Sequence, residues 1–240
     1  FMLSHLLDRF VNFLNEHPDE TVLIHMKYEN TSGTGKTGWD KSVVDLIKSH
    51  CSGHIADFHP RMTLADARGK ILFMIREDYK SANGGRYLGA YLNWTHDKVV
   101  FETTLHGNTG ETAPIKVNDL YNIKNDECIA YTYGATDVTR WCMNYVSCYD
   151  TAHCSVSGIS IFGAVGDYDY CANLYNRYTA DKLNRKDFRG NAGIVLMDFA
   201  GAENATMTYG QTYSNMRVYG DDLVKAVIGV NNKWDLRRNE

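Results

Sequence analysis

Proline is scarce in this sequence, and segments of strongly biased composition are missing. Only 3 prolines occur in 240 residues, while 44% of the residues are hydrophobic and 22% are charged. Such a composition is typical of a folded globular protein and excludes a largely disordered chain or a proline-rich linker. A chain of this length can bury a sizeable core, so we expect a single domain over residues 1–240.

Excess positive charge and long apolar segments are also lacking. The formal net charge is -4, and no run of lysine and arginine is longer than a pair such as Arg237 and Arg238. Because a nucleic-acid partner requires a basic field, we do not expect this protein to bind DNA or RNA. No apolar run approaches the roughly 20 residues that a bilayer-spanning helix needs, so any membrane contact is expected to be peripheral.

Cysteines and glycosylation sequons bear on the cellular compartment. Five of the 6 cysteines, all except Cys51, fall within one central stretch. Such clustering suits disulfide bonds in a secreted protein and equally suits buried thiols in a cytosolic one. Sequons at Asn30, Asn93 and Asn204 favour a secreted or extracellular protein, which is our expectation. Because the chain opens at Phe1 without a methionine, we also expect that further sequence precedes it.

The first third of the chain alternates between predicted helices and predicted buried strands. Residues 3–15 place leucine and phenylalanine at helical spacing, which predicts an amphipathic helix. The apolar run at 21–26 is typical of a strand buried in a parallel sheet. A second helix is predicted over 40–50, and a second buried strand over 71–75. This alternation indicates an α/β protein.

The rest of the chain is less regular. Between about 81 and 150 the periodicity is poor, and only short segments such as 98–103 and 128–133 favour strands. Beyond it we predict two more buried strands, at 159–165 and 193–199. We also predict two helices, one within 171–185 and one over 221–230 with Asp221 as its cap.

Three charged residues follow predicted buried strands: Lys27, Arg76 and Asp198. Parallel sheets bind ligands at the carboxyl ends of their strands, so these side chains are candidates for one site. Two cations suit an anionic substrate because they neutralise phosphate oxygens, and a carboxylate can orient a base. The same residues would equally suit ordinary ion pairs at strand ends, and their spacing alone does not decide between the two interpretations.

Motifs for other chemistry are incomplete. Gly35 and Lys36 lack the preceding glycine of a phosphate-binding P-loop, because Asn30 stands at that position. The cluster around His50 and His54 lacks the paired spacing of a zinc site. We therefore predict no cofactor and no metal.

Three segments resemble the bacterial-type phosphatidylinositol-specific phospholipases C. Residues 6–30 resemble a helix that feeds a barrel strand ending in lysine, and residues 64–78 resemble the next strand, which ends in arginine. Residues 192–200 resemble the last strand of that family, which ends in aspartate. Order and spacing match over most of the chain, whereas residues 81–158 do not align.

The resemblance implies a distorted TIM-type (β/α) barrel, here lacking its first strands. It also implies cleavage of phosphatidylinositol-type lipids to diacylglycerol and a cyclic inositol phosphate by general acid and base catalysis. The two histidines that act as base and acid in that family belong to segments that would precede Phe1. We therefore expect this chain to be inactive alone, with a separate N-terminal segment completing the barrel.

The resemblance also assigns roles to the strand-end residues. Lys27 and Arg76 would bind inositol or phosphate, and Asp198 would hold the general-base histidine in its productive tautomer. A lysine at position 27, where metal-dependent relatives carry a calcium-binding glutamate, predicts a metal-independent site. The expected partner is an inositol phospholipid at a membrane surface.

Two other functions stay open. The chain could be a non-catalytic fragment that binds a phosphoinositide or a sugar phosphate. It could also be a glycerophosphodiester phosphodiesterase, a related metal-dependent barrel with clustered carboxylates. No acidic cluster stands at the predicted strand ends, which disfavours that second alternative.

Overall fold

The computed structural model describes residues 2–28, 39–96, 100–119, 141–147, 155–156, 159–160, 168–188, 192–205 and 216–233. These residues belong to two compact units. The first comprises residues 1–95 and 103–114, and the second comprises residues 96–102 and 115–240. Each unit has a hydrophobic core of its own. That residues 1–240 act as one domain stays a prediction.

The first unit opens with two helix-strand pairs and continues in shorter elements. In order these are α1 (Leu3–Glu16), β1 (Thr21–Met26), α2 (Trp39–His50), β2 (Lys70–Ile75), the 3-10 helix η1 (Ser81–Asn83), β3 (Ala90–Leu92) and β4 (Val100–His106), which extends into the second unit. Helix α1 buries Leu7 and Leu14, two turns apart on its apolar face. It ends at Glu16, and the backbone N–H of the capping residue, His17, still donates to the oxygen of Phe13.

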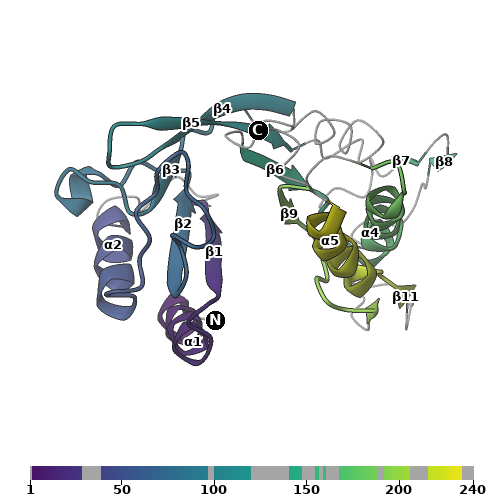
Figure 1. Ribbon diagram of the computed structural model, residues 1–240, viewed down its shortest axis with the longest axis horizontal. Helices are drawn as coiled ribbons and strands as arrows, with labels where there is room; N and C mark the ends of the chain where they lie inside the picture. The colour runs from purple at the N-terminus through teal and green to yellow at the C-terminus, as the bar shows by residue number, and fades with distance from the viewer. Residues whose placement is uncertain are drawn as a thin grey trace. The chain divides into compact units, whose positions relative to one another are not determined.

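The strands β1, β2 and β3 are parallel, so their carboxyl ends lie at one edge of the sheet. Strand β4 runs antiparallel to β3. Both α1 and α2 pack against a single face of this sheet, where they bury Ile71, Phe73 and Ile75 of β2 (Figure 1). The opposite face is therefore the one on which other side chains of β1 and β2 are available for a site.

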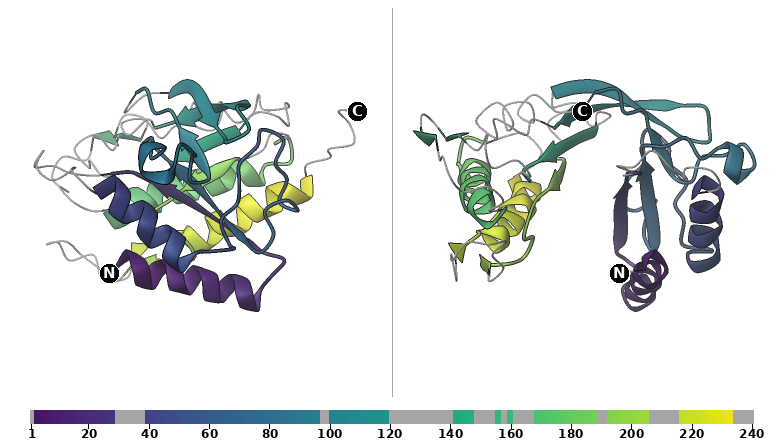
Figure 2. Two further views of the ribbon diagram at one scale, coloured as in Figure 1. Left: turned by 90° about the vertical axis from the view of Figure 1, so that its left-hand side faces the viewer. Right: turned by 180° about the vertical axis from the view of Figure 1, so that it is seen from behind.

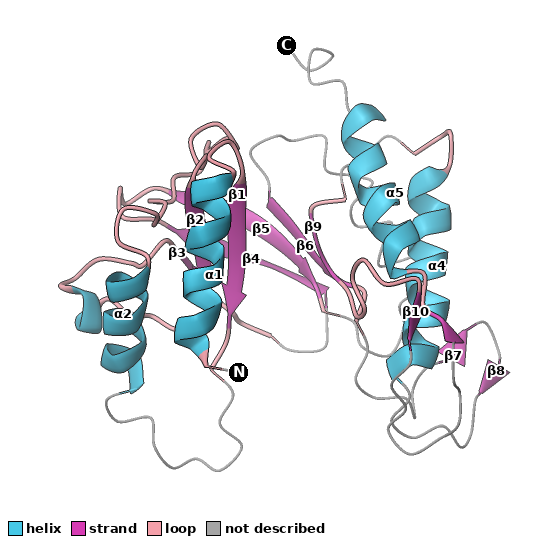
Figure 3. Ribbon diagram, turned by 90° about the horizontal axis from the view of Figure 1, so that it is seen from below, coloured by secondary structure: helices cyan, strands magenta, loops and turns pink. Residues whose placement is uncertain are grey.

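The second unit combines three parallel strands with two long helices. Its elements are β5 (Thr112–Asn118), which begins in the first unit, β6 (Trp141–Tyr145), β7 (Ser155–Val156), β8 (Ile159–Ser160), α4 (Tyr168–Asn184), β9 (Ile194–Leu196), β10 (Asn204–Ala205), β11 (Met216–Arg217) and α5 (Gly220–Lys233). Strand β6 pairs in parallel with both β5 and β9. The helices α4 and α5 lie side by side (Figure 2, Figure 3) and bury Tyr175, Leu183 and Leu223 between them and the strands.

Hydrogen bonding joins seven strands into one mixed sheet with the order β1-β2-β3-β4-β5-β6-β9. Strands β4 and β5 each contribute residues to both units. The sheet is mixed because β4 is antiparallel to β3, whereas a purely parallel sheet was the simplest expectation from alternating helices and strands. The remaining strands form two small antiparallel pairs, β7 with β8 and β10 with β11.

Most predicted elements are confirmed. The helices predicted over 3–15 and 40–50 and the strands predicted at 21–26 and 71–75 correspond to α1, α2, β1 and β2. The two later helices correspond to α4 and α5, although α5 begins at Gly220 and so places Asp221 in its first turn instead of at the cap.

The strand predicted at 159–165 is a strand in its described part but does not belong to the parallel sheet. Residues 159 and 160 form β8, which pairs antiparallel with β7 and lies outside the seven-stranded sheet. The parallel neighbour of β9 is instead β6, whose polar and aromatic sequence does not resemble a buried apolar strand. Residues 161–165, the loop at 30–38 and the segment 128–133 lie outside the described residues.

The cysteines divide by bonding. Cys51 and Cys142 are buried thiols outside any disulfide bond, whereas Cys171, buried on α4, is disulfide-bonded. Burial, together with the nearby Asp8 carboxylate, raises the pKa of the Cys51 thiol to about 11, so this thiol is protonated and packs as an apolar group. Among the helices of the described chain, none has the length and apolar character needed to cross a bilayer.

Candidate active site

The alternation of side chains along β1 and β2 decides which residues face away from α1 and α2. Ile24 and Met26 pack on the helix side of β1, so His25 between them lies on the opposite face. In β2 the helix-side position is Ile75, which puts the next residue, Arg76, on that same opposite face. His25 and Arg76 therefore share the face of the sheet that the two helices leave uncovered.

These two side chains meet a tryptophan at the carboxyl ends of three neighbouring strands. The Nε group of Arg76 donates a hydrogen bond to Nε2 of His25 at 3.2 Å. The guanidinium carbon of Arg76 lies 3.2 Å from the ring centroid of Trp94, which follows β3. The His25 and Trp94 rings lie 6.1 Å apart between centroids. The ends of β1, β2 and β3 thus hold one cation between an imidazole and an indole.

Electrostatics keep this imidazole neutral. Burial of His25, followed by the positive charges of Arg76 and Lys27, lowers its pKa to about 4. A neutral imidazole can accept a hydrogen bond at Nε2, which a protonated one cannot. The exposed Lys27 is close enough for its charge to act on His25, so both predicted cations belong to the same neighbourhood.

The segments that carry the two cations are joined to each other beyond the strand pairing. The backbone N–H of Arg76 donates to the oxygen of Met26 at 3.1 Å, and the carboxylate of Glu77 accepts from the backbone N–H of Tyr28 at 2.9 Å. These bonds connect the residues on either side of Lys27 to the end of β2. One main-chain bond and one bond to a side chain thereby connect the chain segments that carry the two cations.

Asp198 lies in the second unit, two residues beyond the end of β9. The chain turns there, and the next residue, Phe199, has a φ of 56°. This left-handed conformation is uncommon for a bulky residue and persists only when its surroundings enforce it. Gly220 at the start of α5 is part of that enforcement, because a Cβ atom there would lie 1.8 Å from the backbone oxygen of Phe199.

A buried asparagine also holds the Asp198 turn. The side-chain amide of Asn176 on α4 donates to the backbone oxygen of Asp198 at 3.0 Å and to that of Val218 at 2.8 Å. Asn176 is only 1% exposed, so its amide is a buried donor; the bond to Val218 is buried and the bond to Asp198 is part-buried. The turn that presents Asp198 is therefore attached both to α4 and to the segment leading into α5.

The three predicted site residues do not all lie in the same unit. Lys27 and Arg76 come together around His25 in the first unit. Asp198 belongs to the second unit, where it occupies a constrained turn. A single phosphate-sized site containing all three stays a prediction.

Sequence reasoning missed His25 and Trp94. The signal for His25 was its position two residues before Lys27, because alternate residues of a strand point to the same face. Trp94 lies in the region of poor periodicity. The sequence motif that includes it, the sequon at Asn93, indicates glycosylation and not a binding site. The sequence carried no comparable signal that its ring would stack on Arg76.

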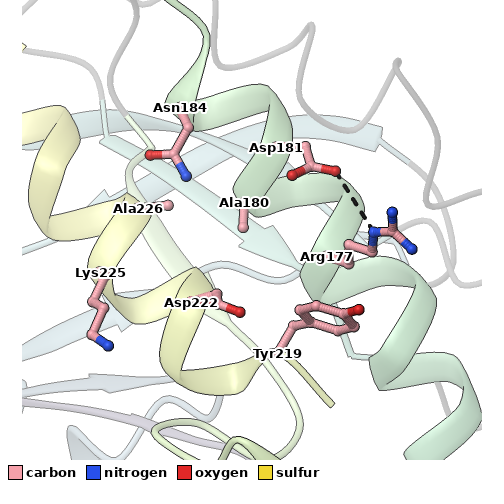
Figure 4. A pocket seen from close by; sticks show the side chains of 8 residues that line it. All are labelled: Arg177, Ala180, Asp181, Asn184, Tyr219, Asp222, Lys225 and Ala226. Carbon is pink, nitrogen blue, oxygen red and sulfur yellow. Dashed lines mark ion pairs between the residues drawn. The ribbon is translucent and has the colours of Figure 1, made fainter. Parts of the chain in front are cut away.

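A hollow of about 410 Å³ lies between α4 and α5 (Figure 4). Its charged lining balances two cations, Arg177 and Lys225, against two carboxylates, Asp181 and Asp222. Arg177 pairs with Asp181 at 3.9 Å within the hollow. Because its charges cancel, this hollow has no excess positive charge for a phosphate group, in contrast to the cluster around Arg76.

No group of three or more histidine, cysteine, aspartate or glutamate side chains that could hold a metal ion occurs within the described parts of the chain. His50 contacts Asp8 at 2.6 Å, and Nδ1 of His54 lies 2.9 Å from the backbone oxygen of Gly69. Both histidines thus have local partners.

No protein-family model matches the sequence. Solved structures do: a mutant of the phosphatidylinositol-specific phospholipase C from Staphylococcus aureus matches with a TM-score of 0.62 and 18% identity, over 93% of this chain and 70% of that one. A pentafluoro-Phe form of the same phospholipase matches with a TM-score of 0.62 and 19% identity over the same shares. A structure concerned with modulating its membrane binding matches at 0.61 and 18%, again over 93% and 70%. The chain therefore has the fold of the bacterial phosphatidylinositol-specific phospholipases C over most of its length, as the resemblance of its strand segments predicted.

Proposed function

We propose that the chain is part of a phosphoric diester hydrolase and lyase of the phospholipase C type, acting on inositol phospholipids. The observation that carries this proposal is the Arg76 guanidinium, held between His25 and Trp94 beside Lys27, at the carboxyl ends of strands in a phospholipase C fold. Strand carboxyl ends are where barrels of this class build their active sites. A pair of cations there suits a phosphodiester.

The proposed reaction is an intramolecular attack. The inositol 2-hydroxyl attacks phosphorus, the bond to the diacylglycerol oxygen breaks, and a cyclic inositol phosphate forms. Lys27 and Arg76 bind the inositol or phosphate oxygens, where hydrogen bonds from charged donors contribute about 1.5–3 kcal/mol each. Asp198 orients the general base through its hydrogen bond to the imidazole and stabilises the imidazolium that forms.

The general base and acid come, in this proposal, from a segment other than residues 1–240. Within the described chain β1 pairs with β2 alone, so its other edge is open to a further strand. Leu23 of β1, which alternates onto the same face as His25, is 37% exposed and would be covered by such a strand. A separate or preceding N-terminal segment would pair there and complete the barrel.

The proposed setting is a membrane surface outside the cell. Peripheral contact fits a protein that acts on a lipid headgroup, and one of the similar structures concerns membrane binding of its phospholipase. The disulfide at Cys171 supports an oxidising compartment, since disulfides persist mainly in secreted proteins.

The test is a product assay on the complete protein with phosphatidylinositol vesicles. Phosphorus NMR should detect a cyclic inositol phosphate, and Arg76→Ala or Lys27→Ala should lower kcat/KM by about tenfold or more, the effect of one lost charge-assisted hydrogen bond. Lys41→Ala is the matched control, because Lys41 is an exposed cation on α2 that pairs with Asp45.

Two outcomes would favour the alternatives. Binding of phosphatidylinositol vesicles without any turnover would identify a non-catalytic binding fragment. Turnover of deacylated glycerophosphodiesters, with no cyclic product from the intact lipid, would identify a glycerophosphodiester phosphodiesterase.

A further inference from the structure

We propose that His25 is a positioning residue that, as a neutral hydrogen-bond acceptor, orients the Arg76 guanidinium toward the anionic substrate. This inference rests on the proposed function, because it concerns the same site. His25, Arg76 and Trp94 lie at the ends of β1, β2 and β3 and contact one another there.

Two contacts together define the orientation of the guanidinium. An arginine side chain has several rotatable bonds, and its use in binding depends on how many of them are restricted. Stacking on Trp94, with 3.2 Å between the guanidinium carbon and the ring centroid, sets the plane of the group. The hydrogen bond from Nε to His25, at 3.2 Å, sets its rotation within that plane. The protein, and not the ligand, then determines the direction in which the edge with both Nη atoms points.

The hydrogen bond also determines the protonation state of His25. Arginine stays protonated in proteins, so Nε of Arg76 is the donor and Nε2 of His25 must be the acceptor. The proton of the neutral imidazole is then on Nδ1. A protonated His25 would place two cations 3.2 Å apart and would lose the bond.

Two cations at neighbouring strand ends favour this neutral form. Arg76 comes from the end of β2 and Lys27 from the end of β1, and both are positive. The Trp94 ring beyond β3 lies nearby, and Met74 is the register partner of His25 in β2. Burial and the two positive charges all act against the charged form of this imidazole.

An arginine held in this way has a defined selectivity. A planar guanidinium of fixed direction binds pairs of oxygens that lie in its plane, such as two phosphate oxygens or two neighbouring hydroxyls of an inositol ring. A lysine at position 76 would retain the charge but would offer neither the Nε donor to His25 nor the flat face to Trp94.

The experiment compares His25→Phe and His25→Gln in the complete protein. Phenylalanine keeps a ring on that face but accepts no hydrogen bond, whereas glutamine restores an acceptor that does not titrate. Binding of inositol 1-phosphate is measured by calorimetry at pH 7, and kcat and KM are measured with phosphatidylinositol vesicles. His54→Gln is the control, because His54 bonds the backbone of Gly69 at the amino end of β2.

We expect His25→Phe to weaken inositol 1-phosphate binding and raise KM by about tenfold, and His25→Gln to recover most of the loss, within about threefold of the unmodified protein. Tight binding by His25→Phe, while the unmodified protein binds equally well, would overturn the positioning role and leave the proposed function intact. A lack of rescue by His25→Gln would also overturn it. Absence of binding and turnover in the unmodified protein would instead contradict the proposed function itself.

Discussion

The side-chain amide of Asn176 donates simultaneously to the backbone oxygens of Asp198 and Val218, at 3.0 and 2.8 Å. One buried residue on α4 thus holds together the turn after β9 and the segment that leads into α5. The bond to Asp198 thus holds the main chain of the residue whose side chain is the predicted catalytic carboxylate.

Replacing Asn176 by alanine should destabilise the protein by about 2 kcal/mol, because the buried carbonyl oxygen of Val218 and the part-buried one of Asp198 would lose their donor. Urea unfolding would measure the change. Asn173→Ala is the matched control, since Asn173 also donates to a backbone oxygen, that of Arg217 at 2.6 Å, but from an exposed position. Equal stabilities of the two variants would contradict the role assigned to Asn176.

Asp198→Asn in the complete enzyme should reduce kcat by at least about a hundredfold, the lower end for disabling acid–base catalysis, while the unfolding temperature changes little. The carboxamide keeps the size of the side chain but loses the charge that would orient an imidazole. Steady-state kinetics and thermal unfolding would be compared with Asp187→Asn, which removes an exposed carboxylate paired with Arg185. Unchanged kinetics would reject the assignment of Asp198.

Gly220→Ala and Gly229→Ala should have opposite effects on stability. A Cβ atom at Gly220 would collide with the backbone oxygen of Phe199, so we expect a loss of at least about 2 kcal/mol. A Cβ at Gly229, within α5, meets nothing within 4 Å, and alanine should stabilise that helix by up to about 1 kcal/mol. Thermal unfolding of both variants is the measurement, and similar effects at the two positions would show that the Phe199 turn is not rigid.

Stability should fall as the pH is lowered from about 6.5 toward 4. The folded protein lowers the pKa of His25 from 6.5 to about 4, so in this window the unfolded chain binds the proton more strongly. The stabilisation is complete above the upper value and is lost as the pH drops through the lower one, with a maximum of about 3 kcal/mol for this group.

The measurement for this prediction is the free energy of unfolding in urea at pH 7, 5.5 and 4. Because other groups also titrate, the informative quantity is the difference between the unmodified protein and His25→Gln. The free energy of unfolding of the unmodified protein should fall relative to that of His25→Gln as the pH approaches 4, and a difference independent of pH would argue against a buried neutral His25.

Activity should survive exhaustive chelation. The ammonium group of Lys27 would repel a divalent cation at the position where metal-dependent relatives are expected to hold calcium. Assays of the complete enzyme with and without a chelator would check this. Activity that is lost on chelation and restored only by calcium would contradict the metal-independent site.

The elements that could be predicted from sequence are those whose composition and periodicity agree with their environment. Strand β2 is buried along almost its whole length, and its apolar run at 71–75 reflects that burial directly. Helix α1 repeats leucine and phenylalanine at the spacing of its buried face. In both cases the local sequence pattern is enough to predict the element.

The strand β6 could not be recognised because its polar residues are satisfied by distant parts of the chain. Asn144 is buried, accepts from Asn118 of β5 at 3.5 Å and donates to the backbone oxygen of Ala192 at 2.9 Å. A buried asparagine is tolerated only with such partners, and neither is a neighbour in sequence. The local sequence of β6 therefore does not predict a strand, because hydrogen bonds from distant parts of the chain are what stabilise it.

The same reason limits what sequence indicates about the site. Lys27 and Arg76 could be proposed from their positions after apolar runs, but His25 and Arg76 meet because β1 and β2 pair in parallel in one register. A shift of that register by one residue would turn one of the two side chains toward the helices. The pairing, which sequence patterns do not specify, is what assembles the cluster.

The mixed strand order has a consequence for the route by which the chain folds. Strands β4 and β5 are neighbours both in the sheet and along the chain, so their pairing closes only a short loop. The parallel pairs β1 with β2 and β6 with β9 join segments separated by a helix or more, and closing such long loops is slow. We therefore expect the hairpin of β4 and β5 to be an early structure in refolding and the strand ends that carry His25 and Arg76 to be assembled late.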